Sequence, residues 1–200
     1  MFAHVTAIQA DPQRIDDLIR IFQDSASDVR SQPGFEEALL LLDRPSGRGM
    51  NIALWDSEET LNNGVGTAQQ IAQRAAETLQ GAARGTNYEV LQHRPGEGKS
   101  VARVSRGSVT PGWFYNTETQ ADMSIIEAAS KQPGYRGFLV LGDRGNKHVL
   151  GMSFWDSMEH LRRSEGTSGY YHQEMERARD QWEGGWTRDV FDVAFELSCL

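Results

Sequence analysis

The stretch Asn51-Ile-Ala-Leu-Trp-Asp-Ser-Glu-Glu-Thr-Leu61 occurs a second time, 100 residues later, as Gly151-Met-Ser-Phe-Trp-Asp-Ser-Met-Glu-His-Leu161. Over residues 32–73 this offset gives fifteen identities in forty-two positions, where unrelated segments of ordinary composition share about two or three. The chain therefore contains two copies of one structural unit. We place repeat 1 at residues 1–92 and repeat 2 at 101–200, joined at 93–100 by a polar linker that contains glycine and proline.

Composition indicates a globular protein with 38% hydrophobic and 24% charged residues. The formal net charge is -8 and no basic run is present, which argues against a nucleic-acid partner or an anionic membrane surface. No apolar run approaches the ~18 residues that span a bilayer, and the first residues lack the pattern of a signal peptide. We therefore expect a cytoplasmic location. The single cysteine, Cys199, provides no disulfide framework.

Alternation, helical spacing and turn residues predict the order β-α-β-β-α-β in each repeat, which is the ferredoxin-like order of an α+β fold. Repeat 1 is expected to contain a strand at 2–9, a helix after Asp11-Pro12, strands at 35–42 and 50–55, a helix interrupted at 62–67 that resumes at 68–84, and a strand at 88–92. Repeat 2 is expected to begin with a strand at 101–105 and to end with one at 190–198.

Two local patterns refine this prediction. The unbroken run Leu39-Leu-Leu-Leu42 indicates a strand that is covered on both faces. After the strand that ends at Trp55, Asp56 is predicted to cap the next helix and Glu59, three residues on, to return a hydrogen bond to the cap. Repeat 2 has the same acidic pair.

The sequence Gln-Pro-Gly-Phe/Tyr at the end of the first helix, and a strand ending in Trp-Asp-Ser before an acidic helix start, occur in both repeats. These residues resemble the antibiotic biosynthesis monooxygenase group of the dimeric α/β-barrel superfamily. The resemblance implies that two ferredoxin-like units pack sheet to sheet as a barrel. A tandem chain would form this barrel within one polypeptide, as an intramolecular pseudo-dimer, with a homodimer of such chains as a further assembly.

Some members of the group oxygenate electron-rich aromatic compounds without metal or flavin. The resemblance therefore implies a small aromatic substrate, dioxygen and no cofactor. In such oxygenases an Asn and a Trp stand four apart on the third strand, which Asn51 and Trp55 match, whereas repeat 2 has Gly151 with Trp155. Both tryptophans also suit a purely structural role as core residues at a strand end, and Asn51 also suits a hairpin turn.

Aromatic residues are unevenly divided, with five in residues 1–100 and thirteen in 101–200. This loading of repeat 2 is typical of a well-packed core or a partner interface, and it also fits a pocket for a flat ligand. If a pocket is present, we expect its substrate-binding residues to be Trp113, Tyr115, Trp155, Tyr170 and Tyr171.

His172 lies among aromatic residues on a predicted helix, where it could act as a general base or bind haem, or could be a solvated surface residue. Haem-degrading relatives carry a Trp on the second helix, but Gly64 and Ser164 stand at that position here. No pair of histidines has the spacing of a helical zinc site.

Two hypotheses follow. The first is a cofactor-independent monooxygenase that acts on a small aromatic or polyketide-like compound, with Asn51, Trp55 and His172 as catalytic residues. The second is a non-enzymatic barrel that binds a small ligand or serves in a stress response.

Overall fold

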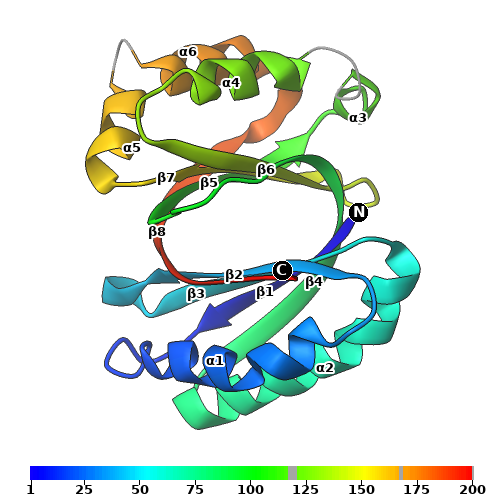
Figure 1. The fold of residues 1–200 in the computed structure, drawn as a ribbon. Coiled ribbons are helices and arrows are strands. Elements are labelled where there is room, and N and C mark those ends of the chain that lie inside the picture. The colour runs from blue at the N-terminus through cyan, green and yellow to red at the C-terminus, as the bar shows by residue number, and fades with distance from the viewer. Residues whose placement is uncertain (117–120, 167–168, 200) are drawn as a thin grey trace. The chain divides into compact units, whose positions relative to one another are not determined.

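The computed structural model describes residues 1–116, 121–166 and 169–199, and their side chains except at 115, 116 and 121–123. The chain has the predicted α+β fold with a large antiparallel sheet (Figure 1). Its first elements are β1 (Phe2–Gln9), α1 (Asp17–Arg30), β2 (Phe35–Asp43), β3 (Arg48–Trp55), α2 (Glu58–Leu79) and β4 (Ala82–Arg94). The others are β5 (Val101–Val109), α3 (Trp113–Asn116), α4 (Ala121–Ser130), β6 (Tyr135–Asp143), β7 (His148–Trp155), α5 (Met158–Glu165), α6 (Tyr170–Arg177) and β8 (Trp182–Ser198).

The chain forms two compact units. Unit 1 comprises residues 1–89 with 192–200, and unit 2 comprises residues 90–191. These limits differ from those of the sequence repeats because β4 and β8, with 13 and 17 residues, extend well beyond the strands predicted at 88–92 and 190–198. Each long strand therefore contributes one segment to each unit.

In unit 1 the strand order is β4-β1-β3-β2-β8, and the four neighbouring pairs are antiparallel. Helices α1 and α2 lie together on one face of these strands (Figure 1). The run Leu39 to Leu42 on β2 is 0–2% exposed at every position. This confirms that the strand is buried on both faces.

In unit 2 the order is β8-β5-β7-β6-β4, with β7 antiparallel to both β5 and β6. Helices α4, α5 and α6 lie on one face of these strands (Figure 1). The two registers correspond closely, since β1 pairs His4 with Ala53 and β5 pairs Arg103 with Ser153. His4 and Arg103 therefore occupy equivalent positions.

The predicted interruption of the helix in repeat 1 is wrong, because α2 is continuous through Gly64 and Gly66. Gly64 is required by packing, since a Cβ there would lie 2.3 Å from the Trp55 ring. A glycine within a helix costs only ~1 kcal/mol, which the contact with a large aromatic side chain can offset. In unit 2 the corresponding helix does separate into α5 and α6.

The predicted helix cap is also displaced by one residue. Ser57, not Asp56, is the N-cap of α2, and Thr60 completes the reciprocal capping box in place of Glu59. Asp56 instead accepts a hydrogen bond from the Thr60 hydroxyl at 2.6 Å. A hydroxyl-bearing cap competes well with a carboxylate, so either residue could satisfy the free N–H groups.

Candidate functional site

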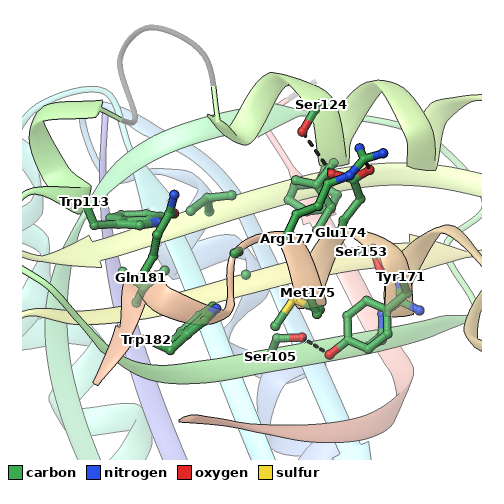
Figure 2. Close-up of a pocket in the computed structure, with 17 residues that line it drawn as sticks. Ser105, Trp113, Ser124, Ser153, Tyr171, Glu174, Met175, Arg177, Gln181 and Trp182 are labelled. Carbon is green, nitrogen blue, oxygen red and sulfur yellow. Dashed lines mark hydrogen bonds and ion pairs between the residues drawn. The ribbon is translucent and has the colours of Figure 1, made fainter. Parts of the chain in front are cut away.

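Unit 2 contains a cavity of about 260 Å³ between its sheet and helices α4 and α6 (Figure 2). Most of the lining is apolar, a surface that suits a small organic ligand. Figure 2 shows Trp113 and Trp182 at one end and Tyr171 at the other, with Met175 between them. The remaining apolar wall consists of Ile125, Phe138, Val140, Val149 and Ala178.

Gly151, on β7, is the residue that opens this space. A Cβ placed on it would meet no atom within 4 Å, and the residue lines the cavity. The register pairs Gly151 with Ser105 in unit 2 and Asn51 with Thr6 in unit 1. The absence of an Asn in the second copy therefore creates room for a ligand.

The cavity's first polar group is the pair Ser105 and Tyr171, whose hydroxyl oxygens lie 2.9 Å apart. The two residues are 8% and 9% exposed. Ser105 comes from β5 and Tyr171 from the first turn of α6, so the pair joins sheet and helix. Each hydroxyl can donate or accept, and one of them can turn towards the oxygen of a ligand.

Arg103 is a charged residue in the cavity wall that is only 2% exposed. Its Nη1 donates to the Ser164 hydroxyl at 2.9 Å and to Glu165 at 3.4 Å, while Nη2 donates to the Tyr170 hydroxyl. Its guanidinium carbon also lies 3.9 Å from the centre of the Tyr171 ring. A buried cation needs this degree of pairing. Because the guanidinium stacks on the Tyr171 ring, it places positive charge next to the Ser105 and Tyr171 pair.

Tyr170 lies behind the cavity wall, where burial raises the pKa of its hydroxyl and the Arg103 guanidinium opposes part of that effect. Trp155, fully buried, packs against Tyr170 with ring centres 6.2 Å apart. Its indole N–H donates to the Ser153 hydroxyl at 3.0 Å. Ser153 lines the cavity, so the core tryptophan orients a polar group in the wall.

Glu174 is an acidic residue of the wall, 8% exposed. Its carboxylate accepts a hydrogen bond from the Ser124 hydroxyl at 3.0 Å and one from Arg177 Nη1 at 2.6 Å (Figure 2). The indole N–H of Trp182, at the other end, is buried and has no acceptor among the described residues. The cavity thus presents a carboxylate, a hydroxyl pair and a free N–H donor.

Asn51 and Trp55 lie together in unit 1, where both line a cavity of about 30 Å³. The Asn51 Oδ1 and the Trp55 Nε1 are buried and have no partner among the described residues. Trp55 is 2% exposed and packs edge-on against Phe35, with ring centres 5.7 Å apart. The space beside this pair is small because α2 approaches the Trp55 ring closely at Gly64.

The other residues predicted for the site divide into three groups. Trp113 and Tyr171 line the unit 2 cavity, whereas Tyr170 and Trp155 support it from behind. His172 is exposed on α6 and does not line the cavity. The side chain of Tyr115 lies outside the described residues.

Sequence reasoning missed the polar part of the cavity, namely Arg103, Ser105, Ser153 and Glu174. Arg103 stands between Ala102 and Val104 on β5, so a charged residue within an apolar stretch of a strand was the available signal. Glu174 follows Tyr170 at i+4 on the same helix face. Without the strand register, neither residue could be distinguished from a residue at a solvent-exposed position.

No helix in the described part of the chain is both long and apolar enough to cross a membrane. The same residues contain no group of three or more His, Cys, Asp and Glu side chains arranged to hold a metal ion. The cytoplasmic location stays a prediction.

Comparison with protein families matches residues 1–70 to the family described as antibiotic biosynthesis monooxygenase. No curated protein sequence matches the chain. Among solved structures, a provisionally assigned monooxygenase from Fusobacterium nucleatum subsp. nucleatum is 10% identical, with a TM-score of 0.77 over 98% of this chain and 94% of that one.

Two further structures give the same result. A provisionally assigned monooxygenase from Lactobacillus acidophilus NCFM has a TM-score of 0.73 at 12% identity, over 99% and 96% of the two chains. An anthrone oxidase-like protein has a TM-score of 0.65 at 16% identity, over 99% and 93%. The resemblance seen in the sequence is therefore confirmed: residues 1–70 match the antibiotic biosynthesis monooxygenase family, and the chain has the fold of these solved structures.

Proposed function

We propose that unit 2 binds a small aromatic or polyketide-like compound and oxygenates it with dioxygen, without a cofactor. The observation that carries this proposal is the cavity of about 260 Å³, with an apolar wall, a buried hydroxyl pair and a buried guanidinium. A cavity of ~150 Å³ lined by apolar side chains already admits benzene. The space in unit 2 exceeds what a single ring needs and therefore suits a flat compound of several fused rings, such as an anthrone.

The size of the unit 1 cavity moves the proposed substrate site away from Asn51 and Trp55. About 30 Å³ is enough for a water molecule but not for an aromatic ring. We accordingly assign substrate binding to Trp113 and Tyr171, and we assign the polar contacts to Ser105, Tyr171 and Glu174.

In the proposed reaction, the substrate loses a proton to the Glu174 carboxylate while the Ser105 and Tyr171 pair holds its oxygen. The positive charge of Arg103, stacked on Tyr171, favours the resulting anion. For an anthrone, the methylene carbon loses both hydrogens and forms a new double bond to one oxygen atom of dioxygen. The second oxygen atom leaves as water, so the substrate itself supplies the electrons.

Oxygen uptake with anthrone tests the proposal, using the two isosteric variants Tyr171→Phe and Glu174→Gln. We expect each to lower the rate ~100- to 1,000-fold, in the range for a lost acid-base group or a lost hydrogen-bond donor to the developing anion. His172→Ala compares the two base assignments, and we expect an unchanged rate because His172 is exposed. A rate that falls with His172→Ala but not with Glu174→Gln would contradict the assignment.

A ligand-binding function without catalysis is the alternative, and the hydrogen bonds of Glu174 favour it. Both oxygens of the carboxylate already accept a hydrogen bond, one from Ser124 and one from Arg177, so neither is free of a protein partner before a ligand binds. In that case anthrone should bind, quenching tryptophan fluorescence, with no oxygen uptake.

The tandem arrangement is the second part of the proposal. We propose that the repeats at 1–92 and 101–200 are ferredoxin-like units that pack sheet to sheet as an intramolecular barrel. The complete burial of Leu39 to Leu42 and the passage of β4 and β8 through both compact units support it. Size-exclusion chromatography with light scattering then tests whether the full chain also forms a homodimer.

A further inference from the structure

Unit 1 contains a buried histidine for which the proposed oxygenation has no use. His4, on β1, is 4% exposed. Its Nδ1 lies 2.6 Å from Oδ1 of Asn87, on the neighbouring strand β4. A carboxamide oxygen only accepts hydrogen bonds, so Nδ1 carries the proton and Nε2 of the neutral ring is left as an acceptor.

His4 lines a cleft of about 330 Å³ between β1, β4 and α2. A Cβ placed on Gly85 would lie 2.6 Å from both Cε1 and Nε2 of His4. Gly85 itself lines the cleft, so any side chain there would overlap the Nε2 end of the imidazole, and glycine leaves that end of the ring in the cleft wall. The other polar groups of the cleft are Thr6, Gln69 and Gln73.

Unit 2 shows what fits beside this strand position. Arg103 is equivalent to His4 by register, and its guanidinium donates to the hydroxyl of Tyr170, a phenol supplied by α6. The repeat offset of 100 aligns Tyr170 with Gln70, the neighbour of Gln69 in the cleft wall. Unit 1 therefore has the polar strand residue and an open cleft, but its helix supplies no phenol.

We propose that the His4 cleft is a second ligand site, which binds a small monocyclic phenol through a hydrogen bond from its hydroxyl to Nε2 of His4. The Asn87 carboxamide is a positioning group that fixes the imidazole tautomer. The ring of the phenol lies against the methyl groups of Ala72, Ala76 and Ala83, which complete the lining. This site is separate from the unit 2 cavity and does not depend on oxygenation there.

The test is an NMR titration of protein labelled with ¹⁵N in its histidine rings, using p-cresol, which has the ring and hydroxyl of tyrosine, as the probe. Toluene, which lacks the hydroxyl, is the matched ligand control. Both titrations use the Gly151→Leu variant, in which the new side chain fills the unit 2 cavity. We expect p-cresol to shift the Nε2 signal of His4 with saturation, and toluene to leave it in place.

His4→Leu should weaken p-cresol binding about five- to tenfold, the range that follows from one hydrogen bond of ~1 to 1.5 kcal/mol. Gly85→Val, which fills the approach to Nε2, should weaken it at least as much. If His4→Leu does not fold, the titration of the Gly151→Leu protein that retains His4, together with Gly85→Val, still decides the matter. A His4 signal that p-cresol leaves unchanged, or that toluene shifts equally, would overturn the proposal.

Discussion

The two units place a buried tryptophan at the end of the same strand, yet the cavities that this strand lines differ about ninefold in volume. In unit 2, β7 lines a cavity of about 260 Å³, whereas in unit 1, β3 lines one of about 30 Å³. Trp55 and Trp155 are 2% and 0% exposed, so both serve as core residues. The tryptophan that the repeats share therefore does not decide whether a pocket is present.

Small residues on the neighbouring elements make the difference. In unit 1, Gly64 lets the continuous helix α2 lie directly on the Trp55 ring. In unit 2 the equivalent Ser164 donates to the Leu161 carbonyl and accepts from Arg103, and α6 begins anew at Tyr170. Gly151 in place of Asn51 adds the remaining room. The core tryptophan is therefore common to both units, whereas the small residues near it determine how much space is left for a ligand.

The largest expected effect comes from separating the units. Residues 1–92 alone lack the β8 segment that pairs with Glu37 to Leu42 of β2 in the full chain. The buried leucine strand would then become an open edge, which promotes association. We expect this fragment to dimerise or aggregate in size-exclusion chromatography, whereas the full chain elutes as a discrete species. A monomeric fragment with a cooperative urea transition would contradict this prediction.

Exchanging the residues at the equivalent positions 51 and 151 should change the difference in cavity volume between the two units. Gly151→Asn places a polar side chain in the unit 2 cavity, and we expect anthrone binding and oxygen uptake to fall more than ~10-fold, since a change of ~1.4 kcal/mol in binding is tenfold. Asn51→Gly is the matched control, because the Trp55 side chain still occupies the core of unit 1. This variant should leave oxygen uptake within twofold of the wild type. Equal effects of the two variants would show that the substrate site was misplaced.

Much of this fold could be predicted from the sequence, because helical spacing and strand alternation are local signals. The strand at 2–9 was predicted with its observed limits, and the Leu39 to Leu42 run correctly indicated burial. The interruption predicted at Gly64 failed because a glycine signals a break only if no partner requires its missing side chain. That partner, Trp55, is nine residues away and meets Gly64 only in the folded unit.

The candidate site was less accessible to sequence reasoning. The uneven distribution of aromatic residues directed attention to repeat 2, where Trp113 and Tyr171 line a cavity. His172 was chosen for its neighbours in sequence, but an α-helix turns adjacent residues to different sides, and it is exposed. The Arg103 contacts join residues more than 60 positions apart, which a single sequence cannot reveal.

Exchanging the residues at the equivalent positions 64 and 164 should lower the stability of the chain in both cases. Gly64→Ser should destabilise the chain by ~1 to 3 kcal/mol, because its Cβ would overlap the Trp55 ring and force repacking. Ser164→Gly removes the hydroxyl that Arg103 contacts and should cost ~1 to 2 kcal/mol. Urea denaturation followed by circular dichroism measures both. A Gly64→Ser loss below ~0.5 kcal/mol, the range of surface changes, would mean that α2 does not rest on Trp55.

The smallest effect concerns the aromatic partner of each tryptophan. Tyr135 packs edge-on against Trp155 with ring centres 6.1 Å apart, as Phe35 does against Trp55 at 5.7 Å. The Tyr135 hydroxyl is buried without a partner among the described residues. Near neutral pH, Tyr135→Phe should therefore stabilise the chain by up to ~1 kcal/mol, because it removes an unsatisfied polar group.

The pH dependence of stability provides a second test of the Tyr135→Phe prediction. Burial raises the pKa of Tyr135 to about 12, above the ~10 of an unfolded tyrosine. The unfolded state therefore loses its proton first, so the contribution of this residue to stability is complete below about pH 10 and is lost as the pH rises towards 12. Tyr135→Phe lacks that loss, and its advantage over the wild type should grow between about pH 9 and pH 11 in urea titrations. Both proteins keep every other tyrosine, so the difference between them reports the removal of the Tyr135 hydroxyl, and a constant difference across this range would place that hydroxyl in contact with water.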